Sequence, residues 1–175
     1  MRPWLKLVLS AAIITVLITP MAAYGQNGTG RPMTARLTGT ASWDWPGDWP
    51  SGCAIATTVT RATGQATHMG LVVLLSTHCP AQPTYLDDGR ITITAANGDM
   101  LYGTYDYDPA PGAQYPTITW TGGTGRFAAA SGSAMMTYEV VQQFKPGCTP
   151  VPSFGCMDFS VPWPWSATLV GTISY

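Results

Sequence analysis

The sequence predicts an all-β protein, and a single antiparallel β-barrel of about eight strands fits it best. Apolar residues make up 46% of the chain and charged residues only 10%, so the composition is that of a folded protein. Glycine (19) and proline (15) are abundant, as expected for short strands joined by tight turns. From Thr34 onward the hydrophobic pattern has period two, or runs through short stretches rich in Thr, Val and Ile.

Eight stretches with this pattern are the expected strands, within a barrel domain that spans residues 34–175. They are residues 34–42, 54–62, 66–76, 90–96, 99–107, 116–121, 133–144 and 166–175. Antiparallel strands in one small domain must hide their edges, and closure into a barrel does so. A two-sheet β-sandwich is the alternative. The interior of an eight-stranded barrel is nearly filled by side chains or holds one small ligand.

Residues 1–25 are expected to be a cleaved signal peptide. Arg2 and Lys6 precede an apolar run over residues 7–19, and small residues then precede a polar chain. The run is shorter than the roughly 20 residues that span a bilayer, which favours cleavage over an uncleaved anchor. Residues 26–33 are expected to be a flexible N-terminal segment. The mature protein would be secreted or periplasmic, with no membrane span.

The charge of the mature chain argues against two classes of partner. Without the two basic residues of the signal peptide, six basic residues face nine acidic ones, a net charge of −3. This balance provides no basic surface for nucleic acid or for anionic lipid.

Four cysteines lie in the exported part: Cys53, Cys79, Cys148 and Cys156. An even number in an oxidising compartment predicts two disulfides, for which three pairings are possible. Cys148–Cys156 is favoured because the proline- and glycine-bearing loop between them lets its ends meet, and Cys53–Cys79 then remains. A zinc site helped by His68 or His78 is the alternative. Because the chain has neither C-x-x-C nor H-x-x-x-H, no metal is expected.

The expected strand at residues 66–76 is apolar on both faces. Part of its outer surface is therefore expected to be covered by a loop, a terminus or another subunit, so a homo-oligomer is possible. His68 is the histidine placed inside this strand. If it points inward, it is a candidate ligand contact or general base. The alternative is a histidine whose nitrogens are satisfied by a neighbouring backbone or hydroxyl group.

The dipeptide Asn97-Gly98 predicts a β-hairpin with a type I′ turn, which requires positive φ at both residues. Asp99 is assigned to the same turn. Opposing Ala96 with Asp99 gives one core face, made of Ile91, Ile93, Ala95, Met100 and Tyr102. The other face is mixed and carries Thr92, Thr94, Leu101 and Tyr105. Tyr102 is therefore a candidate ligand contact.

A Gly-x-Gly-x-x-Ala pattern begins at Gly123 and looks at first like a nucleotide site. A dinucleotide fingerprint needs a helix after the glycines, because the helix N-terminus holds the pyrophosphate. Here strand-like alternation follows instead, the acidic residue expected about 20 positions later is absent, and no Gly-Lys-Ser/Thr occurs. No cofactor is expected.

These glycines are expected to have a structural role. Gly122, Gly123 and Gly125 would supply positive φ in a tight turn or bulge. Arg126 would pair with an aspartate such as Asp99, or with a backbone carbonyl. In the following strand Glu139 is a candidate interior carboxylate, but an outward, solvated position is favoured.

Five tryptophans stand beside prolines or acidic residues and outside the expected strands. They are Trp43, Trp45, Trp49, Trp163 and Trp165. Such residues can stack on sugar rings. The alternative, which we favour, is two rigid loops that pack on each other and cover one end of the barrel.

Four motifs resemble a known group of proteins: GGTGRF (122–127), ATHMG (66–70), AANGD (95–99) and the terminal GTISY (171–175). Together they are similar to allene oxide cyclase-like and dirigent-like β-barrels, and to exported bacterial proteins of unknown function with such a barrel. The resemblance covers roughly residues 34–175. It implies an apolar cavity that positions a reactive substrate, but no catalytic carboxylate of those families can be matched to this chain.

The residues themselves indicate no reaction. The chain lacks a Ser/His/Asp order, paired carboxylates and a P-loop lysine. The sequence therefore predicts a non-catalytic module that binds a small apolar ligand or an envelope partner. One alternative is a cyclase- or dirigent-like enzyme that steers a substrate inside the barrel, and another is carbohydrate binding through the tryptophan-rich loops. The filling of the barrel interior, and the convergence of polar groups there, distinguish these functions.

Overall fold

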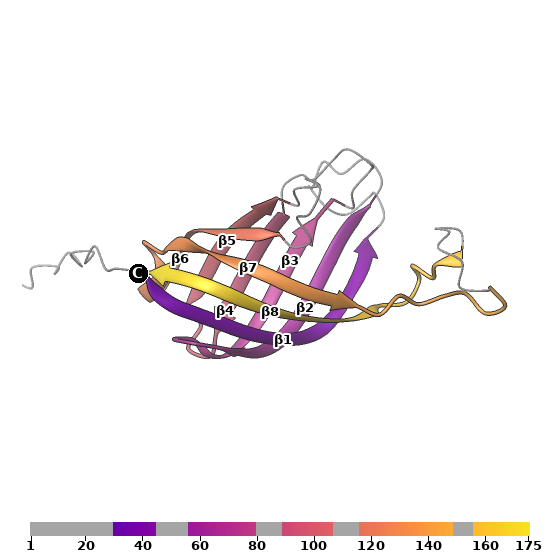
Figure 1. Ribbon diagram of the computed structural model, residues 1–175, viewed down its shortest axis with the longest axis horizontal. Helices are drawn as coiled ribbons and strands as arrows, with labels where there is room; N and C mark the ends of the chain where they lie inside the picture. The colour runs from indigo at the N-terminus through magenta and orange to yellow at the C-terminus, as the bar shows by residue number, and fades with distance from the viewer. Residues whose placement is uncertain (1–29, 45–55, 80–88, 107–115, 149–155) are drawn as a thin grey trace, which may run out of the picture.

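The protein is a closed, eight-stranded antiparallel β-barrel, which confirms the predicted fold class and rules out the sandwich (Figure 1). The computed structural model describes residues 30–44, 56–79, 89–106, 116–148 and 156–175. The strands are β1 (Arg31–Asp44), β2 (Thr57–Ala66), β3 (Gly70–His78), β4 (Gly89–Ala95), β5 (Met100–Asp106), β6 (Thr117–Gly123), β7 (Ser131–Val140) and β8 (Trp163–Ser174). A 3₁₀ turn, η1 (Gly125–Phe127), joins β6 to β7. In the described part, no helix is long and apolar enough to cross a membrane.

Each strand pairs with its neighbours in sequence, and β1 pairs with β8 to close the barrel. The closing register runs from Arg31 opposite Ile173 to Ala41 opposite Trp163, so no edge is left between these two strands. β1 begins three residues earlier than predicted. Its residue Met33 belongs to the core, so the end of the expected flexible segment is ordered strand.

Alternate side chains point into the barrel and form one apolar cluster. Fully buried members come from most strands: Leu37, Leu74, Ile93, Leu101, Ile118 and Leu169. Alanines and glycines lie between these large residues, which allows the two kinds to interdigitate in a narrow barrel. Burying each large aliphatic side chain contributes about 1.5–3 kcal/mol to the free energy of folding. In its middle, the barrel interior is therefore filled by its own side chains.

The turn between β4 and β5 differs from the predicted type I′ turn. Gly98 has positive φ (88°), whereas Asn97 does not. The Gly98 amide donates to the Ala95 carbonyl, and the Ala95 amide donates to the Asp99 carbonyl, which makes a three-residue loop. Such a loop combines a type I turn with a glycine of positive φ at the bulge. The extra residue shifts the register by one.

This shift reverses the predicted faces of β5. Ile93 pairs with Leu101, and Thr92 pairs with Tyr102. Leu101 is fully buried, whereas Tyr102 is 37% exposed on the outer wall, and Met100 is not in the core. A slip of one residue moves every side chain of a strand to the opposite face. The prediction that Tyr102 and Met100 face the core is therefore wrong.

Gly123 and Gly125 serve different purposes in the glycine loop. Gly122 and Gly125 have positive φ, of 124° and 54°, but Gly123 does not. A Cβ at Gly123 would instead collide with the Met100 carbonyl, so the side chain is excluded by close strand approach. Arg126 Nε lies 3.5 Å from Asp99 Oδ2, and this ion pair links the glycine loop to the β4–β5 turn. A strand follows the loop, so no helix is available for a pyrophosphate.

β7 and β8 continue beyond the barrel as a projecting arm, residues 141–148 and 156–162 (Figure 1). The arm is held by backbone hydrogen bonds from Lys145 to Cys156 and from Asp158 to Gln143. The predicted Cys148–Cys156 disulfide closes it, with the Cα atoms 5.6 Å apart. Cys79 is also disulfide-bonded, but its expected partner Cys53 lies outside the described residues.

Candidate functional site

A buried polar cluster lies inside the barrel, at the end where β3 and β5 finish. The Tyr105 hydroxyl is 2.7 Å from Ser76 Oγ and 3.0 Å from His78 Nδ1. Tyr105 starts on β5 and reaches β3 by lying across β4 at Gly89, where a Cβ would strike its ring. Glycine at position 89 thus allows three polar side chains to meet in an otherwise apolar interior.

Burial fixes the protonation states of this cluster. Desolvation lowers the pKa of His78 to about 4, so its imidazole is neutral at neutral pH. Desolvation also raises the pKa of Tyr105 to about 12, against the opposing effect of the hydrogen bond with Ser76. A phenol has one proton, so Tyr105 donates one of its two hydrogen bonds and accepts the other. The three side chains are therefore hydrogen-bonded to one another while all of them are uncharged.

The tryptophans that the structure describes are strand residues, contrary to the prediction of two separate loops. Trp43 belongs to β1, and Trp163 and Trp165 belong to β8. Trp163 is 4% exposed and donates from Nε1 to the Asp158 carbonyl at 2.7 Å. Its ring packs edge-on against Trp43, with ring centroids 4.2 Å apart, where the arm joins the barrel. The buried rings of Trp163 and Trp165 cannot stack on a sugar, whereas Trp43 is half-buried. Trp45 and Trp49 lie outside the described residues.

The predicted ligand contacts do not come together. His68 is in the turn between β2 and β3, not in a strand, and it is exposed with φ of 66°. Its Nε2 lies 3.0 Å from the carbonyl oxygen of Pro32 on β1, so a neighbouring backbone group satisfies the ring, as the favoured alternative predicted. Glu139 is exposed on the outer face of β7, as favoured, and Tyr102 is exposed on β5. The hypothesis of an inward-facing His68 is wrong, because the turn takes its side chain out of the barrel wall.

The outer wall over β3 carries an aliphatic stripe of three residues. Leu71 is 66% exposed, Val73 56% and Leu75 38%. Leu75 pairs with Arg61 of β2 on one side and with Thr92 of β4 on the other. The apolar outer face expected for this strand is thus present, and it lies open within the described part of the chain. Isolated apolar residues on a surface are ordinary, whereas contiguous apolar patches are often associated with interaction sites.

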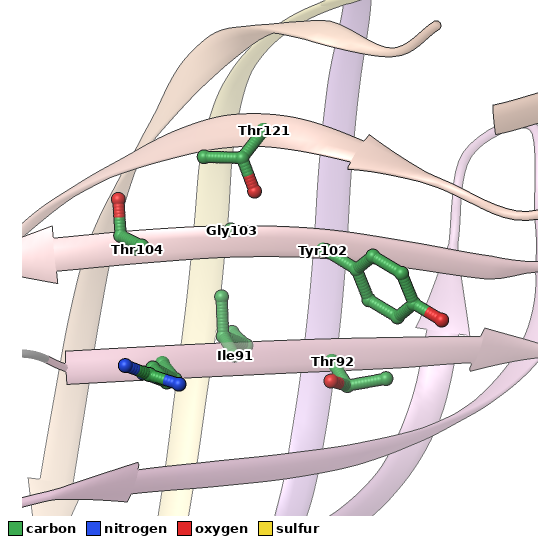
Figure 2. A pocket seen from close by; sticks show the side chains of 7 residues that line it. Ile91, Thr92, Tyr102, Gly103, Thr104 and Thr121 are labelled. Atoms are coloured by element: carbon green, nitrogen blue, oxygen red, sulfur yellow. The ribbon is translucent and has the colours of Figure 1, made fainter. Parts of the chain in front are cut away.

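A depression of about 320 Å³ lies beside this stripe, on the outside of β4, β5 and β6 (Figure 2). Its lining consists of Arg90, Ile91, Thr92, Tyr102, Gly103, Thr104 and Thr121. Figure 2 shows the Tyr102 ring and three threonine side chains around this part of the wall. The site therefore offers one aromatic face, several hydroxyls and one guanidinium.

The depression forms where the barrel wall is irregular. Tyr102 pairs with Gly122, but the next residue, Gly103, pairs with Trp120. Thr121 is therefore an extra residue in β6, and such a bulge bends its strand and redirects a side chain. The neighbouring Gly103 has no side chain to support the wall from inside, where Ile118, Trp120 and Ile91 pack around it. The bulge and the glycine together shape the depression.

Two arginines and one aspartate belong to the strands around this part of the wall: Arg61 on β2, Arg90 on β4 and Asp106 at the end of β5. Arg61 and Arg90 are exposed on β2 and β4, and neither forms an ion pair with any described residue. The acidic residue Glu139 is on β7, and Asp99 is paired with Arg126 at the turn. The described residues contain no group of three or more side chains suited to a metal ion.

Sequence reasoning named His78 only as a possible zinc ligand, and it missed both the cluster of His78 with Ser76 and Tyr105 and the place of Arg90 at the depression. Ser76 and His78 stand at the end of an apolar run, and nothing local shows that Tyr105 reaches them across a glycine. Arg90 is the first residue of an expected strand, which says nothing about a site. Its neighbours on β5 and β6 follow from the shifted register, which the sequence did not predict. Alternation within β3 does place Ser76 and His78 on one face, which was a usable signal.

No family model, curated protein or solved structure matches the chain. The resemblance to allene oxide cyclase-like and dirigent-like barrels therefore remains a prediction. What can be said of function must come from the surfaces and cavities of the barrel itself.

Proposed function

We propose that the protein is an exported, non-catalytic binding module whose site is the outer wall over β3–β6, and that its ligand is a saccharide. The observation that carries this proposal is the depression lined by Tyr102, Thr92, Thr104 and Thr121. Sugars present apolar C–H faces to aromatic rings and hydroxyls to polar side chains, and this lining provides both partners. The volume of about 320 Å³ is at the lower end of ligand sites, which are roughly 300–1,000 Å³.

The filled interior supports a site on the wall. Leu37, Leu74 and Leu169 occupy the middle of the barrel together with the rest of the core cluster. A small apolar ligand in the lumen would have to displace such side chains, and cores pack too densely for that to be cheap. The expected apolar-ligand function is therefore less well supported than binding on the wall.

Export is part of the proposal. The Cys148–Cys156 disulfide and the oxidised Cys79 suit an oxidising compartment. The basic and apolar N-terminal segment supports the same location through its likeness to a signal peptide. A secreted or periplasmic protein would meet cell-envelope or extracellular saccharides.

A titration with neutral and acidic oligosaccharides, followed by ¹H–¹⁵N NMR, tests the proposal. We expect the largest amide shift changes in β4, β5 and β6, and loss of binding in Tyr102→Ala. Met135→Ala is the matched control, because Met135 is also an exposed outward residue but lies on β7. Shift changes confined to Ser76, His78 and Tyr105 would instead place the ligand in the lumen, and no binding of any saccharide would refute the proposal.

The second candidate is the cyclase- or dirigent-like enzyme, favoured by the convergence of Ser76, His78 and Tyr105 inside the barrel. These groups could donate or accept a proton for a substrate that enters at this end. A crystal structure of protein purified from its native host decides the matter. Ligand density within hydrogen-bond distance of the Tyr105 hydroxyl would favour the enzyme, and an interior holding only protein side chains would count against it.

A further inference from the structure

We propose that the outer-wall site selects acidic glycans: a uronic acid residue occupies the depression with its carboxylate on Arg90, and a second anionic group of the same chain reaches Arg61. This inference rests on the proposed function, since it names the class of saccharide for the same site. It depends on the placement of the two exposed arginines around Leu75.

Arg90 is placed to orient a carboxylate in the depression. It lines the depression together with Thr92, Thr104 and Tyr102, on whose ring the sugar would rest. A guanidinium forms two parallel hydrogen bonds with a carboxylate, which a neutral hydroxymethyl group cannot reproduce. Arg90 forms no ion pair with a described residue, so no carboxylate of the described part of the chain has to be displaced.

Arg61 extends the site along the wall. Arg61 pairs with Leu75, Leu75 pairs with Thr92, and Thr77 pairs with Arg90. The two arginines are thus two strands apart and displaced by two residues, which corresponds to a Cα separation of roughly 12 Å from ordinary strand spacing and rise. A ligand of two or more sugar residues matches this span, so the expected ligand is an oligosaccharide.

The surface between the arginines suits such a ligand. Leu75 presents an apolar patch for the C–H face of a ring, and Thr92 presents a hydroxyl beside it. No described outward residue of β2, β3 or β4 is acidic, and the acidic residue of the adjacent strand β5 is Asp106 at its end. The site is open to water, and we expect the binding to weaken as salt screens the charges.

A matched pair of ligands tests the charge directly. Trigalacturonic acid and its methyl ester have the same sugar rings, but only the acid is anionic. Calorimetric titrations at low salt are expected to give binding of the acid at least about tenfold tighter than that of the ester, equivalent to about 1.4 kcal/mol. Arg90→Gln should abolish the difference, and Arg61→Gln should reduce it. The control is Arg36→Gln, because Arg36 is an exposed arginine on β1, away from the depression.

The outcomes separate this inference from the proposed function. Equal binding of acid and ester would overturn the acidic selectivity and leave a neutral saccharide site. Binding of neither ligand nor any other saccharide would overturn both proposals. A preference for the acid that Arg36→Gln reduces as much as Arg90→Gln would also overturn the inference, because it would reflect overall charge and not this site.

Discussion

At the scale of single residues, the contrast between the two histidines shows how position controls chemistry. His68 lies in an exposed turn, whereas His78 lies against Tyr105 and Ser76 inside the barrel. Burial holds the pKa of His78 at about 4, near the lower end of what proteins achieve for this side chain. The pH dependence of stability should therefore depend on His78, not on the histidine that the sequence singled out.

Replacing His78 with Gln is expected to flatten the loss of stability in mild acid. The unfolded chain takes up a proton on this residue near pH 6.5, and the folded protein only near pH 4. Between these values the unfolded state binds more protons, so the free energy of unfolding falls as pH falls, by up to about 3 kcal/mol. Urea unfolding at several pH values measures this.

The His68→Gln variant is the control for this experiment, because His68 is exposed. Its stability curve should run parallel to that of the wild type. The groups described around His78 are the uncharged Ser76 and Tyr105, with Thr58 opposite it on β2, so the shift of its pKa comes from burial and not from a described carboxylate. Parallel curves for His78→Gln and the wild type would show that the imidazole is solvated.

At the scale of elements, the β4–β5 hairpin decides which side chains can bind a ligand. Its three-residue loop turns Leu101 inward and Tyr102 outward. The bulge at Thr121 on β6 then opens the depression next to Tyr102. With the two-residue turn predicted from Asn97-Gly98, the ring of Tyr102 would lie in the core, and the depression would have no aromatic side chain in its lining.

The register of this hairpin can be tested by a pair of adjacent substitutions. Leu101→Ala should lower the free energy of unfolding by about 2–5 kcal/mol, because it empties a fully buried site. Tyr102→Ala should cost less than about 1 kcal/mol, because the ring lies on the surface. Denaturant titrations measure both values. A larger loss of stability in Tyr102→Ala than in Leu101→Ala would instead support the predicted register, in which Tyr102 faces the core.

The projecting arm, residues 141–148 and 156–162, should unfold locally without the barrel. Changing Cys148 and Cys156 to Ser removes a cross-link over a short loop, a local effect of about 2–3 kcal/mol. Amide hydrogen exchange should accelerate at Lys145 and Asp158, whose backbone bonds hold the arm, while Leu169 in the barrel is unaffected. A matching acceleration at Leu169 would mean that the disulfide stabilises the whole barrel.

At the scale of the whole molecule, closure of the sheet limits how a partner could bind. Pairing of β1 with β8 leaves no strand edge between them, so a partner strand cannot be added at this closure. The Cys148–Cys156 disulfide, the disulfide-bonded Cys79 and the basic and apolar N-terminal segment are compatible with an exported protein.

Mass spectrometry of the protein from a culture of its native host tests export. We expect a mature N-terminus near Gln26 and two intact disulfides, Cys53–Cys79 and Cys148–Cys156. Peptide mapping without reduction would identify both pairs. A full-length product retained in the membrane would contradict the cleaved signal peptide, and free thiols would contradict the oxidising compartment.

The sequence by itself determined the barrel, most of its strands and the Cys148–Cys156 pair, because these depend on local pattern and short chain separations. Only the tertiary structure decided which face of β5 is buried, that Tyr105 meets Ser76 and His78 across Gly89, and that the core fills the lumen. The physical reason is that one additional residue in a turn moves every side chain of the following strand to the opposite face of the sheet. A site built from several strands depends on the register of every one of them. A single stretch of sequence contains information about its own strand only.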